Sequence, residues 1–212
     1  MPERQPGPAG GLFVAFEGGE GAGKSTQVEL VARHARAAGF EVVTCREPGG
    51  TPFGEAIRDA LLHGSPTAPI AELLAFNAAR AELVQAVIRP ALERGALVLS
   101  DRFCASTVAY QQFGRGLDAA LVAGVNEMAS GNVIPALQVL LNLTVAEGLG
   151  RRGGPTDRFE AEERVFHERV RAGFLAQAEA APERWLVLDA TRSPEALALD
   201  AWAAIAALLT SR

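Results

Sequence analysis

The segment Gly18–Ser25 constrains the fold of this chain more than any other feature, because its sequence Gly-Gly-Glu-Gly-Ala-Gly-Lys-Ser fits the pattern G-x-x-x-x-G-K-[ST]. An apolar run, Leu12–Phe16, precedes it, and an amphipathic helical pattern, Gln27–Ala38, follows it. Glycines let the backbone curl so that successive N–H groups point at one phosphate, and the helix N-terminus adds partial positive charge. The sequence therefore predicts a nucleoside triphosphate site, formed by Gly18, Gly19, Glu20, Gly21, Ala22, Gly23, Lys24, Ser25 and Thr26.

Two side chains of this loop carry specific expectations. Lys24 is expected to neutralise the β- and γ-phosphates, and Ser25 to ligate Mg²⁺, with Asp101 contributing through a water. Of the 20 basic residues, 19 are arginine, so the only lysine of the chain stands at the phosphate-binding position. The predicted cofactor is Mg²⁺, with ATP as co-substrate.

The rest of the chain repeats the alternation of apolar runs and helical patterns. Apolar runs lie at Val42–Cys45, Ala96–Leu99, Leu137–Leu143 and Trp185–Leu188. Helical patterns cover Gly54–Leu62, a long stretch from Ile70, and Pro194–Leu209, and we expect Pro90 to kink or end the long one. Continuous apolar strands between helices are typical of a parallel sheet covered on both faces, so we predict an α/β fold with five parallel strands.

The composition limits how many domains the chain can form and which kinds of partner it can bind. With 212 residues and 49% hydrophobic composition, residues 11–212 fit a single domain, while residues 1–10 are rich in proline and glycine and read as a loose tail. A net charge of −5 argues against nucleic acid as a partner. No apolar stretch approaches the roughly 20 residues of a membrane span, which favours a cytoplasmic protein without a membrane partner. Two cysteines and three histidines show neither a disulfide framework nor zinc spacing.

The apolar strand before Asp101 separates classes of triphosphate-using proteins. The guanine-reading pattern N-K-x-D and the pattern D-x-x-G of switch GTPases do not occur. Motor-type ATPases carry Asp-Glu at the end of this strand, whereas this chain has Asp101-Arg102. Arginine cannot act as a base, but it binds a phosphate bidentately. The dipeptide therefore favours an enzyme that aligns two phosphorylated molecules.

The chain resembles the bacterial thymidylate kinase family, which are P-loop nucleoside monophosphate kinases, over Leu12–Leu209. The resemblance rests on Phe16–Thr26, on Arg46-Glu47-Pro48-Gly49-Gly50-Thr51, on Phe76–Arg80, and on Asp101-Arg102-Phe103 with Ser106–Gln111. It implies an α/β P-loop kinase fold with a short mobile lid. It also implies transfer of the γ-phosphoryl group of ATP to dTMP, giving dTDP and ADP, in the biosynthesis of dTTP. It also implies a homodimer, for which the patterns at Ile70–Arg89 and Leu117–Ser130 have enough apolar surface.

The resemblance also implies an acceptor site. Glu20 is expected at the 3′-hydroxyl of dTMP, and Tyr110 in the space that a ribose 2′-hydroxyl would need. Phe76 and Arg80 lie four residues apart, hence on one helix face, with Phe76 stacked on thymine and Arg80 donating to a thymine carbonyl. Thr107 and Gln111 are expected near the base edge. The remaining predicted dTMP contacts are Pro48, whose preceding peptide is cis in the family, Arg58 and Arg102 at the phosphate, and Ser106.

The catalytic cation is expected from a lid. One group of thymidylate kinases carries an arginine in the phosphate loop directly after the acidic residue, and the other supplies arginines from a mobile lid. This chain has Gly21 at that loop position, so the lid, at about residues 147–160, must carry the charge. Arg151 and Arg152 are the candidates, beside Gly153 and Gly154, and together with Lys24, Asp101 and Arg102 they complete the predicted catalytic set.

Two other functions remain open at this stage. A deoxynucleoside kinase shares the fold but phosphorylates an uncharged nucleoside, so Arg58 would lack a phosphate partner. A regulatory P-loop protein would bind nucleotide without transferring phosphate and would need no acceptor pocket.

Overall fold

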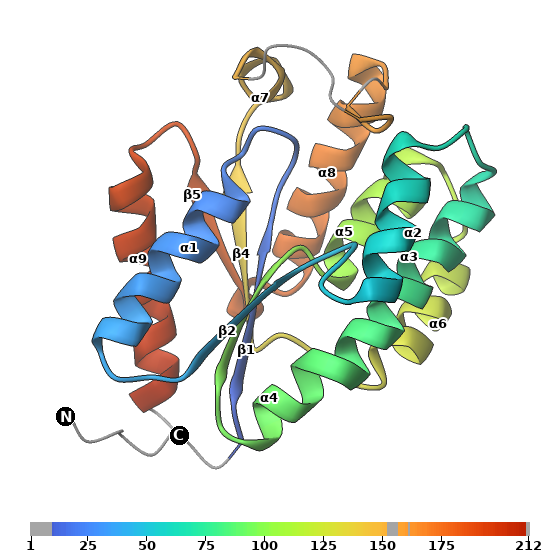
Figure 1. Cartoon of the computed structure of the whole chain (residues 1–212). Coiled ribbons are helices and arrows are strands. Elements are labelled where there is room, and N and C mark those ends of the chain that lie inside the picture. Colours follow the sequence, from blue (N-terminus) through green and yellow to red (C-terminus); the bar gives the residue numbers. More distant parts are fainter. Residues whose placement is uncertain (1–9, 152–156, 161, 211–212) are drawn as a thin grey trace.

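The computed structural model of the chain describes residues 10–151, 157–160 and 162–210. Its centre is one sheet of five parallel strands in the order β2-β3-β1-β4-β5 (Figure 1). The strands are β1 (Leu12–Glu17), β2 (Val42–Arg46), β3 (Leu97–Asp101), β4 (Leu137–Asn142) and β5 (Trp185–Asp189). The predicted α/β class and the five-stranded parallel sheet are confirmed, and each strand lies within two residues of its predicted bounds.

The central strand β1 determines where the site forms. All six residues of β1 are buried, as expected for a parallel strand that is covered on both faces. Phe16 of β1 and Arg46 of β2 are both in register with Asp101 of β3. The carboxyl ends of three neighbouring strands therefore meet at one edge of the sheet, where ligands of open α/β sheets bind.

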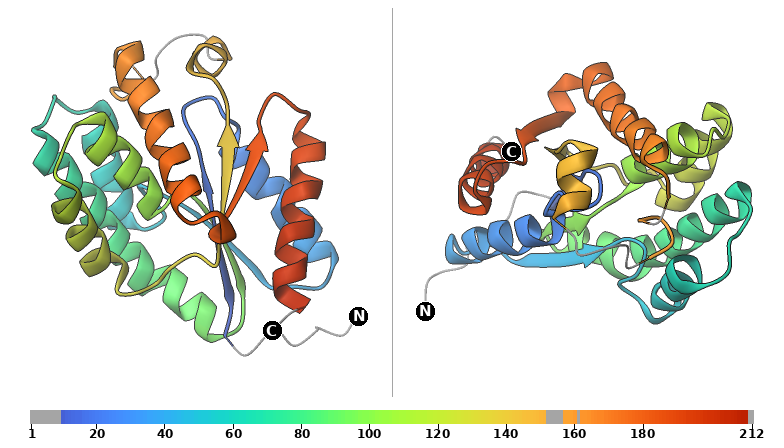
Figure 2. Two further views of the ribbon diagram at one scale, coloured as in Figure 1. Left: turned by 180° about the vertical axis from the view of Figure 1, so that it is seen from behind. Right: turned by 90° about the horizontal axis from the view of Figure 1, so that it is seen from above.

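Helices cover both faces of the sheet (Figure 2). On one face lie α1 (Lys24–Ala37) and α9 (Pro194–Thr210), whose apolar side chains form one core cluster with the strands. On the other face lie α3 (Pro69–Leu83), α4 (Arg89–Glu93), α5 (Cys104–Thr107) and α8 (Arg164–Ala180). Helices α2 (Pro52–His63) and α6 (Ala119–Ser130) pack against α3, and α7 (Val145–Gly150) follows β4.

Two helices contain π-helical turns. Val84–Ile88 joins α3 to α4, and Val108–Gly114 continues α5. Of the two predicted effects of Pro90, a kink or an end of the long helix, the end is wrong, because the chain stays helical from Pro69 through Glu93. The π-helical turn directly before Pro90 shifts the hydrogen-bond pattern to i→i+5, which accommodates a residue without an N–H.

Some expectations fall at or beyond the described ranges. Residues 1–9 of the predicted tail and residues 152–156 of the predicted lid, including Arg152, lie outside the described residues. Within the described ranges no helix is long and apolar enough to cross a membrane.

Candidate active site

The loop between β1 and α1 has the geometry of a phosphate cradle. Gly23, with φ +90°, adopts a left-handed conformation directly before α1, so the helix starts at Lys24 rather than at Gln27 as predicted. The Lys24 ammonium donates to the carbonyl oxygens of Gly18 at 3.1 Å and Gly19 at 2.8 Å. Burial lowers the pKa of Lys24 from 10.5 to about 8, with repulsion from Arg102 acting in the same direction.

Ser25 and Asp101 place two oxygen atoms beside this loop. Ser25 Oγ donates to Asp101 Oδ2 at 2.5 Å across the gap between α1 and the end of β3. Within the described ranges, no three histidine, cysteine, aspartate or glutamate side chains gather to hold a metal ion. Mg²⁺ at nucleotides needs only one or two protein oxygens, because substrate phosphates and waters supply the others. Ser25 and Asp101 fit that requirement.

Arg102 directly follows β3 and has an unusual backbone conformation. Its φ is +74°, in the left-handed region that residues other than glycine rarely adopt. Its guanidinium donates to Glu20 Oε1 at 2.7 Å, to Gly18 O at 3.2 Å and to Ser106 Oγ at 3.1 Å. A non-glycine residue in this region is retained where surrounding contacts determine it, often at a functional site.

Buried Glu17 holds the segment after Arg102. Its carboxylate accepts hydrogen bonds from the Phe103 N–H at 2.9 Å and from Ser106 Oγ at 2.6 Å. Burial raises the pKa of Glu17 from 4.5 to about 7, and the hydrogen bond from Ser106 and the charge of Arg102 limit that rise. Glu17 at the end of β1 thus anchors Phe103, which follows Arg102 in the chain, and Ser106, which accepts a hydrogen bond from Arg102.

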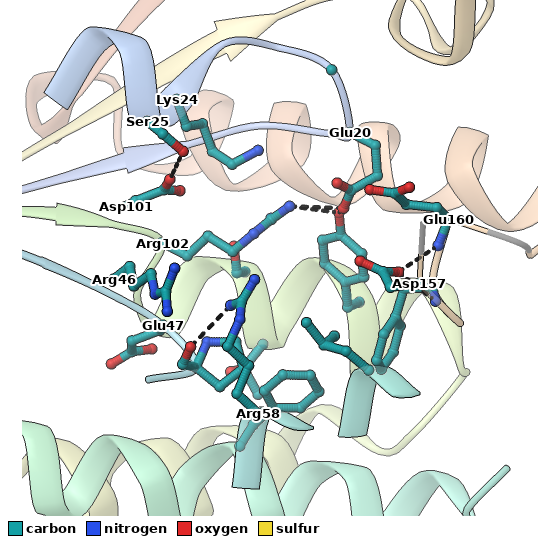
Figure 3. Close-up of a pocket in the computed structure, with 18 of the residues that line it drawn as sticks. Glu20, Lys24, Ser25, Arg46, Glu47, Arg58, Asp101, Arg102, Asp157 and Glu160 are labelled. Atoms are coloured by element: carbon teal, nitrogen blue, oxygen red, sulfur yellow. Dashed lines mark hydrogen bonds and ion pairs between the residues drawn. The ribbon is translucent and has the colours of Figure 1, made fainter. Parts of the chain in front are cut away.

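A cavity of about 520 Å³ extends from the phosphate loop along the edge of the sheet. Figure 3 shows its two sides, with Arg46, Arg58 and Arg102 on one and Glu20, Asp157 and Glu160 on the other. Arg58 donates to the carbonyl oxygen of Pro48 at 3.0 Å, and the Glu47–Pro48 peptide bond is cis. Three guanidinium groups on one side of a cavity can bind a phosphate that is separate from those held by the P-loop.

Glu20 and Tyr110 meet inside this cavity. The Tyr110 hydroxyl donates to Glu20 Oε1 at 2.5 Å, and its ring centroid lies 5.0 Å from the Arg102 guanidinium carbon. Burial raises the pKa of the Tyr110 hydroxyl, so it remains a donor at neutral pH. The carboxylate of the phosphate loop is therefore fixed beside the aromatic ring.

Arg80 lines the cavity as part of a dense polar network. It forms an ion pair with Glu47 and donates to the side chains of Asn77, Asn126 and Thr107, at 2.6 to 3.1 Å. These contacts occupy all five N–H groups of the guanidinium. Burial raises the pKa of Glu47, although the charge of Arg80 and its hydrogen bonds act in the opposite direction.

The other predicted base contacts also line the cavity. Phe76, one turn before Arg80 on α3, lines the cavity with its ring centroid 5.6 Å from that of Phe159. Thr107 and Gln111 lie on the facing segment. Gln111 Nε2 is buried and has no hydrogen-bond partner among the described residues. An amide donor that is buried without a partner indicates a ligand acceptor atom at this position.

Residues 147–151, the first described part of the predicted lid, lie above the phosphate loop (Figure 1). Arg151 directly follows α7, lines the cavity, and donates to Ala190 O at 2.8 Å and to Gly21 O at 3.4 Å. Arg158 forms an ion pair with Glu72 at 3.1 Å, and its backbone N–H donates to Leu62 O. Of the predicted lid arginines, Arg151 is thus placed at the cavity.

Sequence reasoning missed several residues that line the cavity. Arg46 and Glu47 belong to the segment on which the resemblance rests, but no role was predicted for them. Asp157, Phe159 and Glu160 fall within the predicted lid, but roles were predicted only for its arginines. The position of Glu47 next to the predicted contact Pro48 is a signal that could have pointed to it. The corresponding signal for Glu17 is a carboxylate at the end of an entirely apolar run.

A P-loop that opens into a cavity with a second cationic site defines a P-loop kinase acting on a phosphorylated acceptor. The family model described as Thymidylate kinase matches residues 16–200. The chain belongs to the thymidylate kinase family, as the resemblance implied.

Individual relatives agree with this membership. The chain is 49% identical to thymidylate kinase of Thermomicrobium roseum, over 91% of this chain and 93% of that protein. It is 48% identical to thymidylate kinase of Deinococcus radiodurans, over 92% and 96% respectively. The crystal structure of thymidylate kinase from Ehrlichia chaffeensis matches with a TM-score of 0.76 at 31% identity, covering 92% of this chain and 98% of that one.

Proposed function

We propose that this protein transfers the γ-phosphoryl group of ATP to dTMP, giving dTDP and ADP. The observation that carries the proposal is the single cavity that joins the phosphate loop to the arginine cluster Arg46, Arg58 and Arg102. A nucleoside acceptor would leave this cluster without a phosphate, and a non-catalytic nucleotide-binding module would need no second site. Both alternatives are therefore disfavoured.

On the donor side, the loop backbone and Lys24 hold the β- and γ-phosphates of ATP. Ser25 and, through a water, Asp101 would hold Mg²⁺, which would supply charge neutralisation at the phosphates. Phosphoryl transfer needs little covalent help from the protein, so the main contribution of these residues is positioned charge. Arg102 spans the two sites, because it contacts the loop at Gly18 and also faces the acceptor cavity.

On the acceptor side, Arg58 and Arg102 bind the phosphate of dTMP, with Arg46 beside them. Glu20 accepts a hydrogen bond from the 3′-hydroxyl. Tyr110 fills the space next to C2′ and so selects deoxyribose over ribose. Phe76 stacks on thymine, and the unpartnered Gln111 amide donates to an acceptor atom of the base edge. Arg80 has no unused donor, so a direct bond to thymine requires it to release one partner, for which neutral Thr107 costs less than Glu47.

The lid supplies the remaining cation. Gly21 leaves the phosphate loop without an arginine, so the negative charge on the transferring phosphoryl group is met by Lys24 and by Arg151 or Arg152. Arg151 already lies at the cavity beside Gly21.

The proposal includes a homodimer and a cytoplasmic location. Ile70 and Leu74 are exposed on α3, and Leu121 and Met128 on α6, although all four are large apolar residues. Helices α3 and α6 pack side by side (Figure 1), and we propose that these exposed apolar residues belong to the surface that a second copy covers. We propose a cytoplasmic location because the substrates, dTMP and ATP, are metabolites of that compartment.

The test is ADP release with ATP as donor and dTMP, dUMP, dCMP, AMP or thymidine as acceptor. We expect turnover with dTMP to exceed turnover with dCMP, AMP and thymidine, and Lys24→Ala to lower it by several orders of magnitude. Preferred turnover of thymidine would identify a nucleoside kinase. ATP binding without turnover of any acceptor would identify a regulatory module.

A further inference from the structure

Two glycines bring the phosphate loop and α7 into direct backbone contact. Gly21 adopts φ +69°, and a Cβ on it would overlap the carbonyl oxygen of Gly148 and lie 2.9 Å from the carbonyl carbon. A Cβ on Gly148 would in turn overlap the carbonyl oxygen of Glu20. Each backbone therefore occupies the place where a side chain of the other would lie, and Figures 1 and 2 show α7 directly above the loop.

This contact fixes the helix that precedes Arg151. Thr144 and Glu147 form a capping box at the start of α7, and the Arg151 N–H donates to Glu147 O at 3.1 Å, so the arginine continues the last turn. Gly148 lies one turn before Arg151. The Arg151 side chain then reaches Gly21 O and Ala190 O. The position of Arg151 over the loop thus depends on how closely α7 approaches it.

We propose that the contact between Gly21 and Gly148 positions Arg151 over the transferring phosphoryl group. The inference rests on the lid-arginine role proposed above, and it makes Gly148 a positioning residue that contacts neither substrate. It also gives a physical reason for glycine at position 21. A side chain there would push α7, and Arg151 with it, away from the phosphates.

Two alanine substitutions in the same helix separate this role from general stability. Gly148→Ala introduces a Cβ against Glu20 O, whereas Gly150→Ala introduces one with no atom within 4 Å. Neither glycine has a positive φ, and both substitutions favour helix to the same degree, so only the contact with the loop differs. Gly148→Ala is preferable to Gly21→Ala because alanine at φ +69° is strained whatever the space.

The experiment measures kcat, KM for dTMP, KM for ATP and the melting temperature for both variants. A misplacement of about 1 Å can lower a rate about 100-fold. We therefore expect kcat of Gly148→Ala to fall at least about tenfold with little change in KM for dTMP, while Gly150→Ala keeps the wild-type kcat. Equal kcat values in the two variants would overturn the inference.

A double-mutant cycle with Arg151→Ala distinguishes positioning from a structural role, even if Gly148→Ala lowers the melting temperature. If Gly148 acts through Arg151, adding Gly148→Ala to Arg151→Ala leaves kcat unchanged. If the double variant instead loses kcat by the product of the two single-variant factors, Gly148 acts independently of Arg151, which contradicts the inference. A normal kcat for Arg151→Ala would also overturn it, yet would leave dTMP phosphorylation itself untouched.

Discussion

Lys24 shows what burial does to a single charged group of the phosphate loop. The side chain is only 8% exposed, and burial lowers its pKa to about 8. In the free enzyme the ammonium therefore loses its proton within the range where enzymes are commonly assayed. Bound phosphates favour the charged form, so the effect belongs to the enzyme before ATP binds.

The first prediction concerns the pH dependence of ATP use. Because neutral Lys24 cannot pair with the phosphates, kcat/KM for ATP should fall as pH rises through about 8, at saturating dTMP. Lys24→Arg is the control, since its guanidinium stays charged above pH 12. Its activity should be lower but without this alkaline decline. A wild-type profile that stays flat to pH 9.5 would contradict the account.

At the scale of residues, the sequence predicted which side chains line the site better than it predicted which side chains contact one another. Lys24, Ser25, Asp101 and Arg102 follow from the loop pattern and from the end of one strand, so local reasoning found them. Glu47 is different, because its partner Arg80 lies 33 residues away and belongs to another element. Only the fold brings such a pair together, and spacing along the chain carries no signal for it.

At the scale of elements, the Arg80 network ties four segments together. Glu47 follows β2, Asn77 and Arg80 lie on α3, Thr107 ends α5, and Asn126 lies on α6. The guanidinium and the carboxylate are both almost fully buried, with side-chain exposures of 2% and 6%. Removing one partner of a buried ion pair leaves the other charge uncompensated.

The second prediction concerns the stability that this pair provides. Glu47→Gln should lower the free energy of unfolding by about 3–5 kcal/mol, because Arg80 cannot lose its proton. Asp200→Asn is the matched control, since Asp200 pairs with Arg192 at 2.7 Å with both side chains 45% exposed. The free energy of unfolding of Asp200→Asn should fall by about 1 kcal/mol or less. Urea unfolding of both measures the difference, and similar losses would refute the prediction.

The sequence located most elements but not the irregularities in them. Apolar runs predicted five strands because buried parallel strands lack polar alternation. The π-helical turn Val108–Gly114 was not predicted, although it carries Tyr110 and Gln111 into the cavity. Its geometry depends on packing against α8, where a Cβ on Gly173 would lie 2.7 Å from the Phe113 ring. Such packing between distant segments leaves no periodic signal.

At the scale of the whole molecule, the exposed apolar residues of α3 and α6 predict self-association. Leu74→Glu would place a charge in the proposed interface, because the side chain is 54% exposed on α3. We expect this variant to sediment as a monomer and the wild type as a dimer. Leu199→Glu is the control, since Leu199 is 56% exposed on α9 at the opposite face. A wild-type monomer, or dissociation by both variants, would exclude this interface.

In the proposed reaction, one cavity aligns two phosphorylated substrates. The most direct measurement is the ratio of kcat/KM for dTMP to that for thymidine, in the wild type and in Arg58→Met. If each of three guanidinium groups contributes about 1.5 kcal/mol to binding the acceptor phosphate, the wild-type ratio is about 10³ or more. In Arg58→Met the ratio should fall about tenfold or more through the value for dTMP, while the value for thymidine stays unchanged. A wild-type ratio near one, or equal losses for both acceptors, would contradict the two-phosphate geometry.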